Sequence, residues 1–312
     1  MATLYSENPD NFDELEPHLI TEFETCKSAI ESAALVIFYD TCAVQHHSAL
    51  PPQYQLKIYD YLKSKNAVVA VVKCVLMELA GDRHHLHSQV IQYLKAMAEN
   101  GIRIILFDES YVFGFLTDVY QSAATVNEKL RYAVRNFNKP TTTIRETVNN
   151  NAELKVLVSD DEIPTDKDLC ERFFSLVRSN KQHKDNLGEQ PIGICIYILL
   201  HLPAEPTHKF TIFTDDKGAA RIINISTKSI PADVSDKRAG IFSSAKLFQN
   251  MYDENFLANE AELKEVIEKI FPSNISVLAL MEKSDLTTSE YTFTTEKLAH
   301  LITLKNTIRI AF

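Results

Sequence analysis

Acidic residues stand at the ends of two short apolar runs that lie far apart in the chain. Asp40 follows the run at 35–38, and the pair Asp215 and Asp216 follows the run at 210–214. A continuous apolar run of this length predicts a buried parallel strand, and the carboxyl ends of such strands line the ligand crevice of open α/β sheets. Carboxylates gathered at one sheet edge repel one another unless a cation lies between them. The pattern therefore predicts a divalent cation site.

Two further acids are expected at the same edge. Glu78 lies in 75–81, a short predicted helix that directly follows a strand, and Glu189 lies in a second predicted helix at 187–200. Asn186 is the expected N-cap of that helix, whose dipole would favour the ionised form of Glu189. Mg²⁺ and Mn²⁺ prefer oxygen ligands of this kind. Two such ions, about 3.5–4 Å apart, could activate a water and stabilise the leaving oxygen of a phosphodiester.

The elements that must position these acids follow an alternating pattern. The sequence predicts strands at 35–38, 67–72, 102–107 and 210–214, and helices at 17–32, 51–65, 74–80, 87–99 and 187–200. Strands that alternate with helices are typical of a parallel sheet with right-handed crossovers. The predicted fold class is therefore α/β, with a central parallel sheet and flanking helices.

The alternation stops after the third strand. Residues 109–184 contain no convincing strand but two helical patterns, at 117–136 and 167–179, which indicates a helical insertion. After residue 251 the chain shows a helix at 259–271, an apolar run at 275–280 and a helix at 295–304. We therefore predict an N-terminal polar segment and helix (1–34), an α/β domain with the helical insertion (35–250) and a small C-terminal α/β tail (251–312).

Composition and charge exclude several classes of protein. The 312 residues are 45% hydrophobic and 24% charged, as in ordinary globular proteins. A net charge of −10 argues against a general nucleic-acid coat, though an enzyme could still hold nucleic acid along a local basic stripe. The 5 scattered cysteines form no CxxC pair, which favours reduced thiols. Without an apolar run of membrane length or a basic N-terminal leader, the sequence predicts a cytoplasmic protein with no membrane contact.

Histidine and nucleophile sites are less well supported. His84 and His87 have the spacing of a zinc pair on a helix, but no second pair accompanies them, so a solvated loop is the better interpretation. His46 and His47 follow Asp40 closely and could contact phosphate. Thr41 and Cys42 also follow Asp40, yet no glycine-flanked nucleophile elbow surrounds them. The sequence also contains neither a GxGxxG nor a Walker-type loop.

Taken in order, the acidic motifs resemble those of the PIN-domain nucleases. The matching segments are the apolar strand with Asp40-Thr41-Cys42, the Glu-Leu pair at 78–79, the Gly-Glu pair at 188–189, and TDDKGAAR at 214–221. The resemblance covers residues 35–225 apart from the insertion. It implies a Mg²⁺- or Mn²⁺-dependent endonuclease, most often acting on single-stranded RNA, with Thr41 helping to hold the first acid and its water. The family pattern selects Asp216 as the last acid whereas strand-end counting selects Asp215, so both remain candidates.

Basic residues on both sides of the acids are candidates for binding substrate. We expect the insertion to present Arg178, Lys181 and Lys184 to substrate phosphates, and Lys217 and Arg221 to flank the acids from the other side. A solvated helix end explains these charges equally well. Two other functions stay open: a PIN-fold binding module without turnover, and another metal-dependent phosphohydrolase. The insertion and tail are also possible contact surfaces for a protein partner or a second copy.

Overall fold

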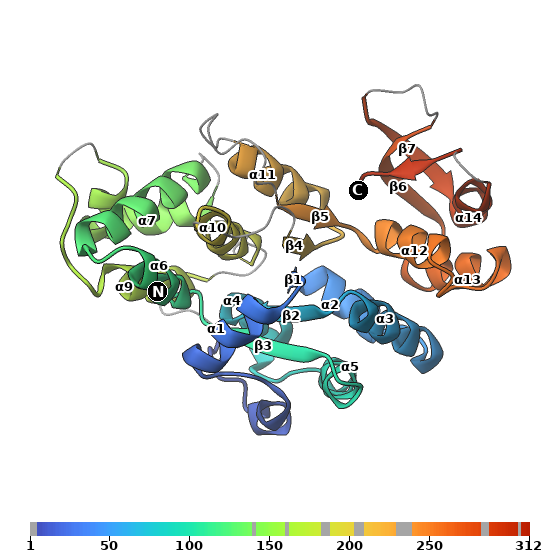
Figure 1. Cartoon of the computed structure of the whole chain (residues 1–312), viewed down its shortest axis with the longest axis horizontal. Coiled ribbons are helices and arrows are strands. Elements are labelled where there is room, and N and C mark those ends of the chain that lie inside the picture. The colour runs from blue at the N-terminus through green and yellow to red at the C-terminus, as the bar shows by residue number, and fades with distance from the viewer. Residues whose placement is uncertain are drawn as a thin grey trace.

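The computed structural model describes residues 5–138, 142–159, 162–181, 188–202, 209–228, 239–281, 287–304 and 307–312. A five-stranded parallel sheet lies at its centre, in the order β3-β2-β1-β4-β5 (Figure 1). The strands are β1 (Leu35–Tyr39), β2 (Ala67–Val72), β3 (Arg103–Phe107), β4 (Phe210–Phe213) and β5 (Gly240–Phe242). Every residue of β2 is buried, as its β-branched sequence predicts for a strand covered on both faces.

The strand order reverses between β1 and β4. From β1 the chain builds outward through β2 to β3, and β4 then returns to the other side of β1, so that Phe38 pairs with Ala70 on one side and with Ile212 on the other. In an open α/β sheet the crevice outside the carboxyl ends of the strands, at this reversal, is where ligands bind. The residues that follow β1 and β4 therefore occupy the position where a site is expected.

Helices cover both faces of the sheet, and α10 is buried along its entire length. These helices are α1 (Phe23–Ser32), α2 (Thr41–Ser48), α3 (Pro52–Ser64), α4 (Lys73–Ala80), α5 (Ser88–Glu99), α10 (Glu189–Leu200), α11 (Lys217–Lys228) and α12 (Ser244–Asp253). Short 3-10 turns occur at Phe12–Glu14, Glu16–His18 and Gly81–Arg83. From Pro191 onward the sequence of α10 is apolar except for the Tyr197 hydroxyl, so this part of the helix lies inside the core because it has no polar face to turn towards water.

The insertion between β3 and α10 is helical in its described residues, as predicted. It contains α6 (Tyr111–Val119), α7 (Ala123–Phe137), α8 (Thr143–Asn150), α9 (Leu169–Ser179) and a 3-10 turn at Ala152–Leu157, and it forms the green side of the molecule in Figure 1. The single helix predicted at 117–136 is wrong. Tyr120 and Ser122 have extended backbone and separate α6 from α7.

The C-terminal part carries a second, antiparallel sheet in the order β7-β6-β8. Its elements are α13 (Glu260–Ile270), β6 (Asn274–Leu280), β7 (Ser289–Thr294), α14 (Thr295–Thr303) and β8 (Arg309–Ile310). The predicted boundary at residue 250 lies inside α12, whose buried Gln249 bonds to the backbone of Ile308 and Ile310. The predicted α/β fold class, with its parallel sheet, helical insertion and small tail, is confirmed.

Other elements differ from the sequence prediction. The helix expected at 17–32 begins only at Phe23. Ile20 instead forms a parallel bridge with Ile105, through backbone hydrogen bonds to Ile104 and Leu106, and so covers the outer edge of β3. The sequence prediction also lacks α2, α11, α12, β5, β7 and β8. β5 has three half-buried residues and so leaves no long apolar run to detect. In the described part of the chain, no helix combines the length and the apolar composition that crossing a membrane requires.

Candidate functional site

The candidate acids gather around the reversal between β1 and β4. Asp40 follows β1 directly and is the N-cap of α2, while Asp215 and Asp216 lie between β4 and α11. Glu78 lies on α4, which follows β2, and Glu189 is the first residue of α10. Glu189 interacts electrostatically with Asp40, Glu78 and Asp216, and Asp40 also interacts with Glu78. Four separate segments of the chain thus contribute carboxylates to one region.

Asp40 is buried and held by hydrogen bonds from three sides. Its carboxylate accepts from the Thr41 backbone N–H at 2.8 Å, from the Cys42 thiol at 3.1 Å and from the Thr214 hydroxyl at 2.7 Å. Burial, together with the charge of Glu78, raises the pKa of Asp40 to about 6, although the three donors act in the opposite direction. The acid therefore serves as a helix cap and, at the same time, as a fixed oxygen donor in the site.

Glu78 is tied to three different segments. The Thr41 hydroxyl donates to its Oε2, the Gly188 N–H donates to Oε1 at 3.0 Å, and the Lys181 ammonium lies 2.9 Å from Oε1. Gly188 is required for this approach, because a Cβ at that position would lie 2.5 Å from Oε2. The Thr41 hydroxyl therefore contacts Glu78, whereas the resemblance predicted that Thr41 helps to hold Asp40.

Glu189 is buried and incompletely bonded. Its side chain is 7% exposed, and its Oε1 has no hydrogen-bond partner among the described residues. Burial, followed by the charges of Asp40, Glu78 and Asp216, raises the pKa of Glu189 to about 9. The sequence-based expectation that the helix dipole keeps this acid ionised is wrong, because desolvation and the neighbouring acids outweigh the dipole.

Asp215 and Asp216 point to different partners. Asp215 accepts from the Ser244 N–H at 2.7 Å, from the Ser244 hydroxyl at 2.6 Å and from His46 Nδ1 at 2.6 Å. These bonds outweigh burial and hold the pKa of Asp215 below its usual value. Asp216 is exposed, caps α11 through the N–H groups of Gly218 and Ala219, and contributes to the raised pKa of Glu189. The geometry therefore favours Asp216 over Asp215 as a member of the acidic site.

The predicted basic residues fall into two groups. Arg178 and Lys181 are buried: Arg178 pairs with Glu109 at 2.6 Å and Lys181 pairs with Glu78. Both are thus engaged with carboxylates rather than displayed on a rim. Lys217 pairs with Glu290, and Arg221 is exposed on α11. Lys184 lies outside the described residues, as does the expected cap Asn186.

The alternatives based on cysteine and histidine receive little support from the geometry. Burial and the charge of Asp40 raise the pKa of the Cys42 thiol, which donates to Asp40 and so remains protonated. Burial lowers the pKa of His47 to about 4, so this ring is neutral, and it lies among aromatic side chains. His84 has a left-handed backbone after a short turn, and His87 caps α5.

The donor set fits an oxygen-liganded divalent cation in its chemistry. Carboxylate oxygens are the ligands that Mg²⁺ and Mn²⁺ prefer, and Glu189 Oε1 is a buried acceptor that lacks a partner within the described chain. In the side-chain positions described here, no three His, Cys, Asp or Glu residues already form a group able to hold an ion. The Asp40 carboxylate instead accepts hydrogen bonds from Thr214 and Cys42, and the Glu78 carboxylate pairs with Lys181. An ion would therefore have to share these carboxylates with their present partners.

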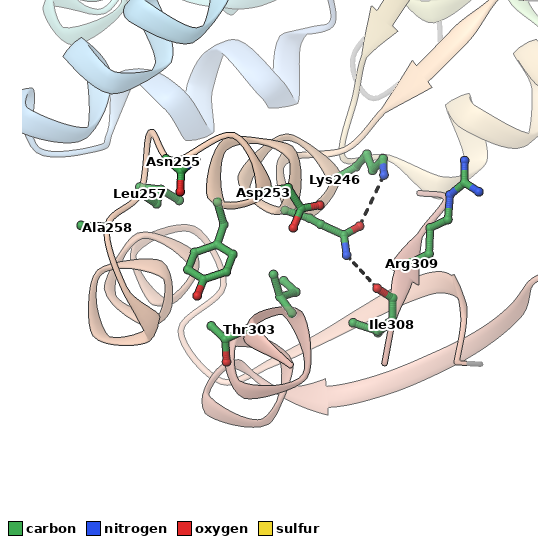
Figure 2. Close-up of a pocket in the computed structure, with 11 residues that line it drawn as sticks. Lys246, Asp253, Asn255, Leu257, Ala258, Thr303, Ile308 and Arg309 are labelled. Atoms are coloured by element: carbon green, nitrogen blue, oxygen red, sulfur yellow. Dashed lines mark hydrogen bonds between the residues drawn. The ribbon is translucent and has the colours of Figure 1, made fainter. Parts of the chain in front are cut away.

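Two cavities of similar volume lie outside the acidic cluster. One of about 650 Å³ lies between α12, α14 and β8, where Lys246, Asp253 and Arg309 surround it without any candidate acid (Figure 2). Another, of about 620 Å³, lies between α11 and the small sheet and is lined by Lys217, Arg221 and Glu290. The second is the relevant one, because it begins beside the cap formed by Asp216.

Three contacts within the site were not predicted from the sequence. Thr214 orients Asp40, the Gly188 N–H holds Glu78, and Lys181 pairs with Glu78. A hydroxyl residue directly before the acidic pair was a usable signal for Thr214. The Lys181–Glu78 pair had no such signal, because the two residues are brought together only by the tertiary fold.

Comparison of the chain with protein-family models, with curated proteins and with solved structures gives no match. The chemistry of the site has to be inferred from its own residues.

Proposed function

We propose that this protein is a metal-dependent endonuclease that hydrolyses phosphodiester bonds in single-stranded RNA. The observation that carries the proposal is the buried Glu189 Oε1, which has no hydrogen-bond partner among the described residues and lies in electrostatic contact with Asp40, Glu78 and Asp216 at the strand-order reversal. The raised pKa values of Asp40 and Glu189, two buried acids of this cluster, mark a candidate functional site on physical grounds. The resemblance of the acidic motifs to PIN-domain nucleases supports the reaction class and RNA as substrate.

Asp40, Glu189 and Asp216 would hold Mg²⁺ or Mn²⁺, with Glu78 beside them. Such an ion lowers the pKa of a bound water and polarises a phosphodiester oxygen. Thr214 and the Thr41 N–H fix the orientation of the Asp40 carboxylate. Glu189, protonated at neutral pH in the ion-free chain, would give up its proton when it becomes a ligand.

The groove beside α11 supports a strand-like substrate. Lys217 and Arg221 line it close to Asp216, and the small sheet forms its other wall through Leu278 and Glu290. Arg221 is exposed, and no ion pair to it is present among the described side chains. Contacts of this type hold phosphates and position a strand without reading its sequence.

We also infer a cytoplasmic location. The cysteines at 26, 42, 74, 170 and 195 are all free thiols, as a reducing compartment maintains them.

The test is cleavage of a labelled single-stranded RNA by the full chain. We expect cleavage with Mn²⁺ or Mg²⁺, none with EDTA, and none with Asp40→Asn, whereas Asp60→Asn on the exposed side of α3 should cleave like the wild type. Duplex RNA and single-stranded DNA of the same sequence test the choice of substrate. Hydrolysis of a small phosphate monoester without RNA cleavage would instead support another metal-dependent phosphohydrolase.

A PIN-fold binding module without turnover is the second candidate. It is favoured by the Lys181–Glu78 pair, which already neutralises one acid without an ion. Such a module needs no metal, so its melting temperature should not respond to millimolar Mn²⁺. The proposed nuclease should melt at a higher temperature with Mn²⁺, because an ion that binds only the folded chain stabilises it by mass action.

A further inference from the structure

Lys181 occupies an unusual position for a lysine. It follows α9 and its cap Asn180, its side chain is 3% exposed, and its ammonium lies 2.9 Å from Glu78 Oε1. A buried ammonium costs several kcal/mol of desolvation unless a carboxylate and further contacts compensate for it. The fold therefore places a lysine, paired with Glu78, within the acidic site.

The position of Lys181 is fixed by its surroundings. Its ammonium lies 5.2 Å from the centre of the Tyr5 ring, a cation–π contact. Arg178, one turn earlier, is clamped between Glu109 Oε2 at 2.6 Å and Glu7 Oε2 at 3.0 Å. The N-terminal segment and the end of β3 thus hold the C-terminal end of α9 against the site, and Lys181 cannot swing out as a surface lysine does.

Glu78 has little capacity left for an ion. A carboxylate offers about four acceptor positions. The Gly188 N–H and Lys181 use those of Oε1, and Thr41 uses one on Oε2. On the other side of the site, Glu189 Oε1 has no partner in the described chain. The two sides of the acidic cluster are therefore unequal: one holds a lysine, and the other has an open carboxylate oxygen.

We propose that the Lys181 ammonium takes the place of a second metal ion, so that the site binds a single divalent cation between Asp40, Glu189 and Asp216. This inference rests on the proposed nuclease function. Lys181 then supplies the positive charge that a second ion would otherwise present to the substrate phosphate. A fixed ammonium beside developing negative charge stabilises it without reorganisation during the reaction.

The test measures the stoichiometry of Mn²⁺ binding to the full chain, by calorimetry and by electron paramagnetic resonance. We expect a single ion in the wild type and in Lys181→Arg, which retains the charge. Lys181→Met removes the charge but keeps a similar length, and it should bind a second ion that is magnetically coupled to the first. Lys264→Met, at an exposed pair with Glu296, is the matched control and should bind a single ion.

Two ions in the wild type would overturn the inference while leaving the nuclease proposal intact. A folded Lys181→Met variant that still binds a single ion would overturn it as well, because removing Lys181 would then not have opened a site for a second ion. If that variant does not fold, the wild-type stoichiometry still decides. Failure of the wild type to bind any Mn²⁺ would contradict both the proposed function and this inference.

Discussion

At the residue scale, Glu189 links the site to the pH dependence of stability. Its pKa is about 9 in the folded chain against an ordinary value of 4.5, so between these values the folded chain binds more protons than the unfolded chain. Stability in the absence of metal must therefore fall as pH rises through this interval. Asp40, whose pKa is about 6, contributes in the same direction over a narrower range.

Glu189→Gln should remove the larger part of this pH dependence and leave the part that Asp40 contributes. In EDTA at pH 8, we expect the variant to unfold with a free energy higher than that of the wild type by on the order of 1–3 kcal/mol, since one pKa unit corresponds to about 1.4 kcal/mol. At pH 4 the Glu189 carboxyl is mostly neutral in the folded and in the unfolded wild type. The difference in unfolding free energy between wild type and variant should therefore vanish. Urea titrations at the two pH values measure the effect. An equal difference at both would mean that the change acts through packing instead of charge.

Asp215 and Asp216 can be separated by a pair of substitutions. Asp216→Asn keeps a good helix cap but loses the charge that faces Glu189, so we expect weaker Mn²⁺ binding with little loss of stability. Asp215→Asn loses an acceptor that Ser244 and His46 share, and it should lower the melting temperature while Mn²⁺ affinity stays near the wild-type value. Calorimetry and thermal melting measure the two effects. If Asp215→Asn weakened Mn²⁺ binding and Asp216→Asn did not, Asp215 would be the ligand.

At the scale of elements, the start of α10 depends on a glycine. Gly188 has an ordinary helical φ of −55°, so Gly188→Ala introduces no backbone strain. Its Cβ would nevertheless lie 2.5 Å from Glu78 Oε2 and push that carboxylate away from Lys181 and Thr41. We expect a loss of about 1–3 kcal/mol of stability, as for other overpacked sites, together with weaker Mn²⁺ binding.

Gly193→Ala is the matched control on the same helix. Its Cβ would collide with Phe137 at 2.3 Å, inside the core and away from the acids. It should therefore destabilise the chain to a similar extent without changing Mn²⁺ affinity. If both variants weakened Mn²⁺ binding equally, the effect would be a general consequence of disturbing α10.

The sequence predicted the central elements well because their signals are local. β2 was predicted with its observed bounds, since six apolar, mostly β-branched residues leave no alternative in a buried sheet. The choice between Asp215 and Asp216 was not available from spacing, because it depends on how the turn after β4 directs each side chain. The Thr214 hydroxyl, which accepts from the Asp216 N–H at 3.1 Å, sets that turn. The role of Lys181 likewise needed the tertiary fold.

At the scale of the whole molecule, the groove between α11 and the small sheet should carry substrate. Arg221→Ala should weaken binding of single-stranded RNA and reduce the slope of log affinity against log salt by about 0.7, the value for one phosphate contact on a single strand. Arg103→Ala, at the opposite edge of the sheet where β3 begins, should leave both unchanged. Filter binding in Ca²⁺ at several salt concentrations measures this, and equal effects of the two variants would remove the groove from the substrate path.

The position of β4 between β1 and β5 has a consequence for the newly made chain. β1, β2 and β3 are synthesised first, and until β4 arrives the edge of β1 remains unpaired. Glu189 and Asp216 join Asp40 and Glu78 only when α10 and β4, which follow later in the chain, dock against β1. The first three strands made therefore bring together only Asp40 and Glu78, and the proposed site is complete only once the chain reaches Asp216.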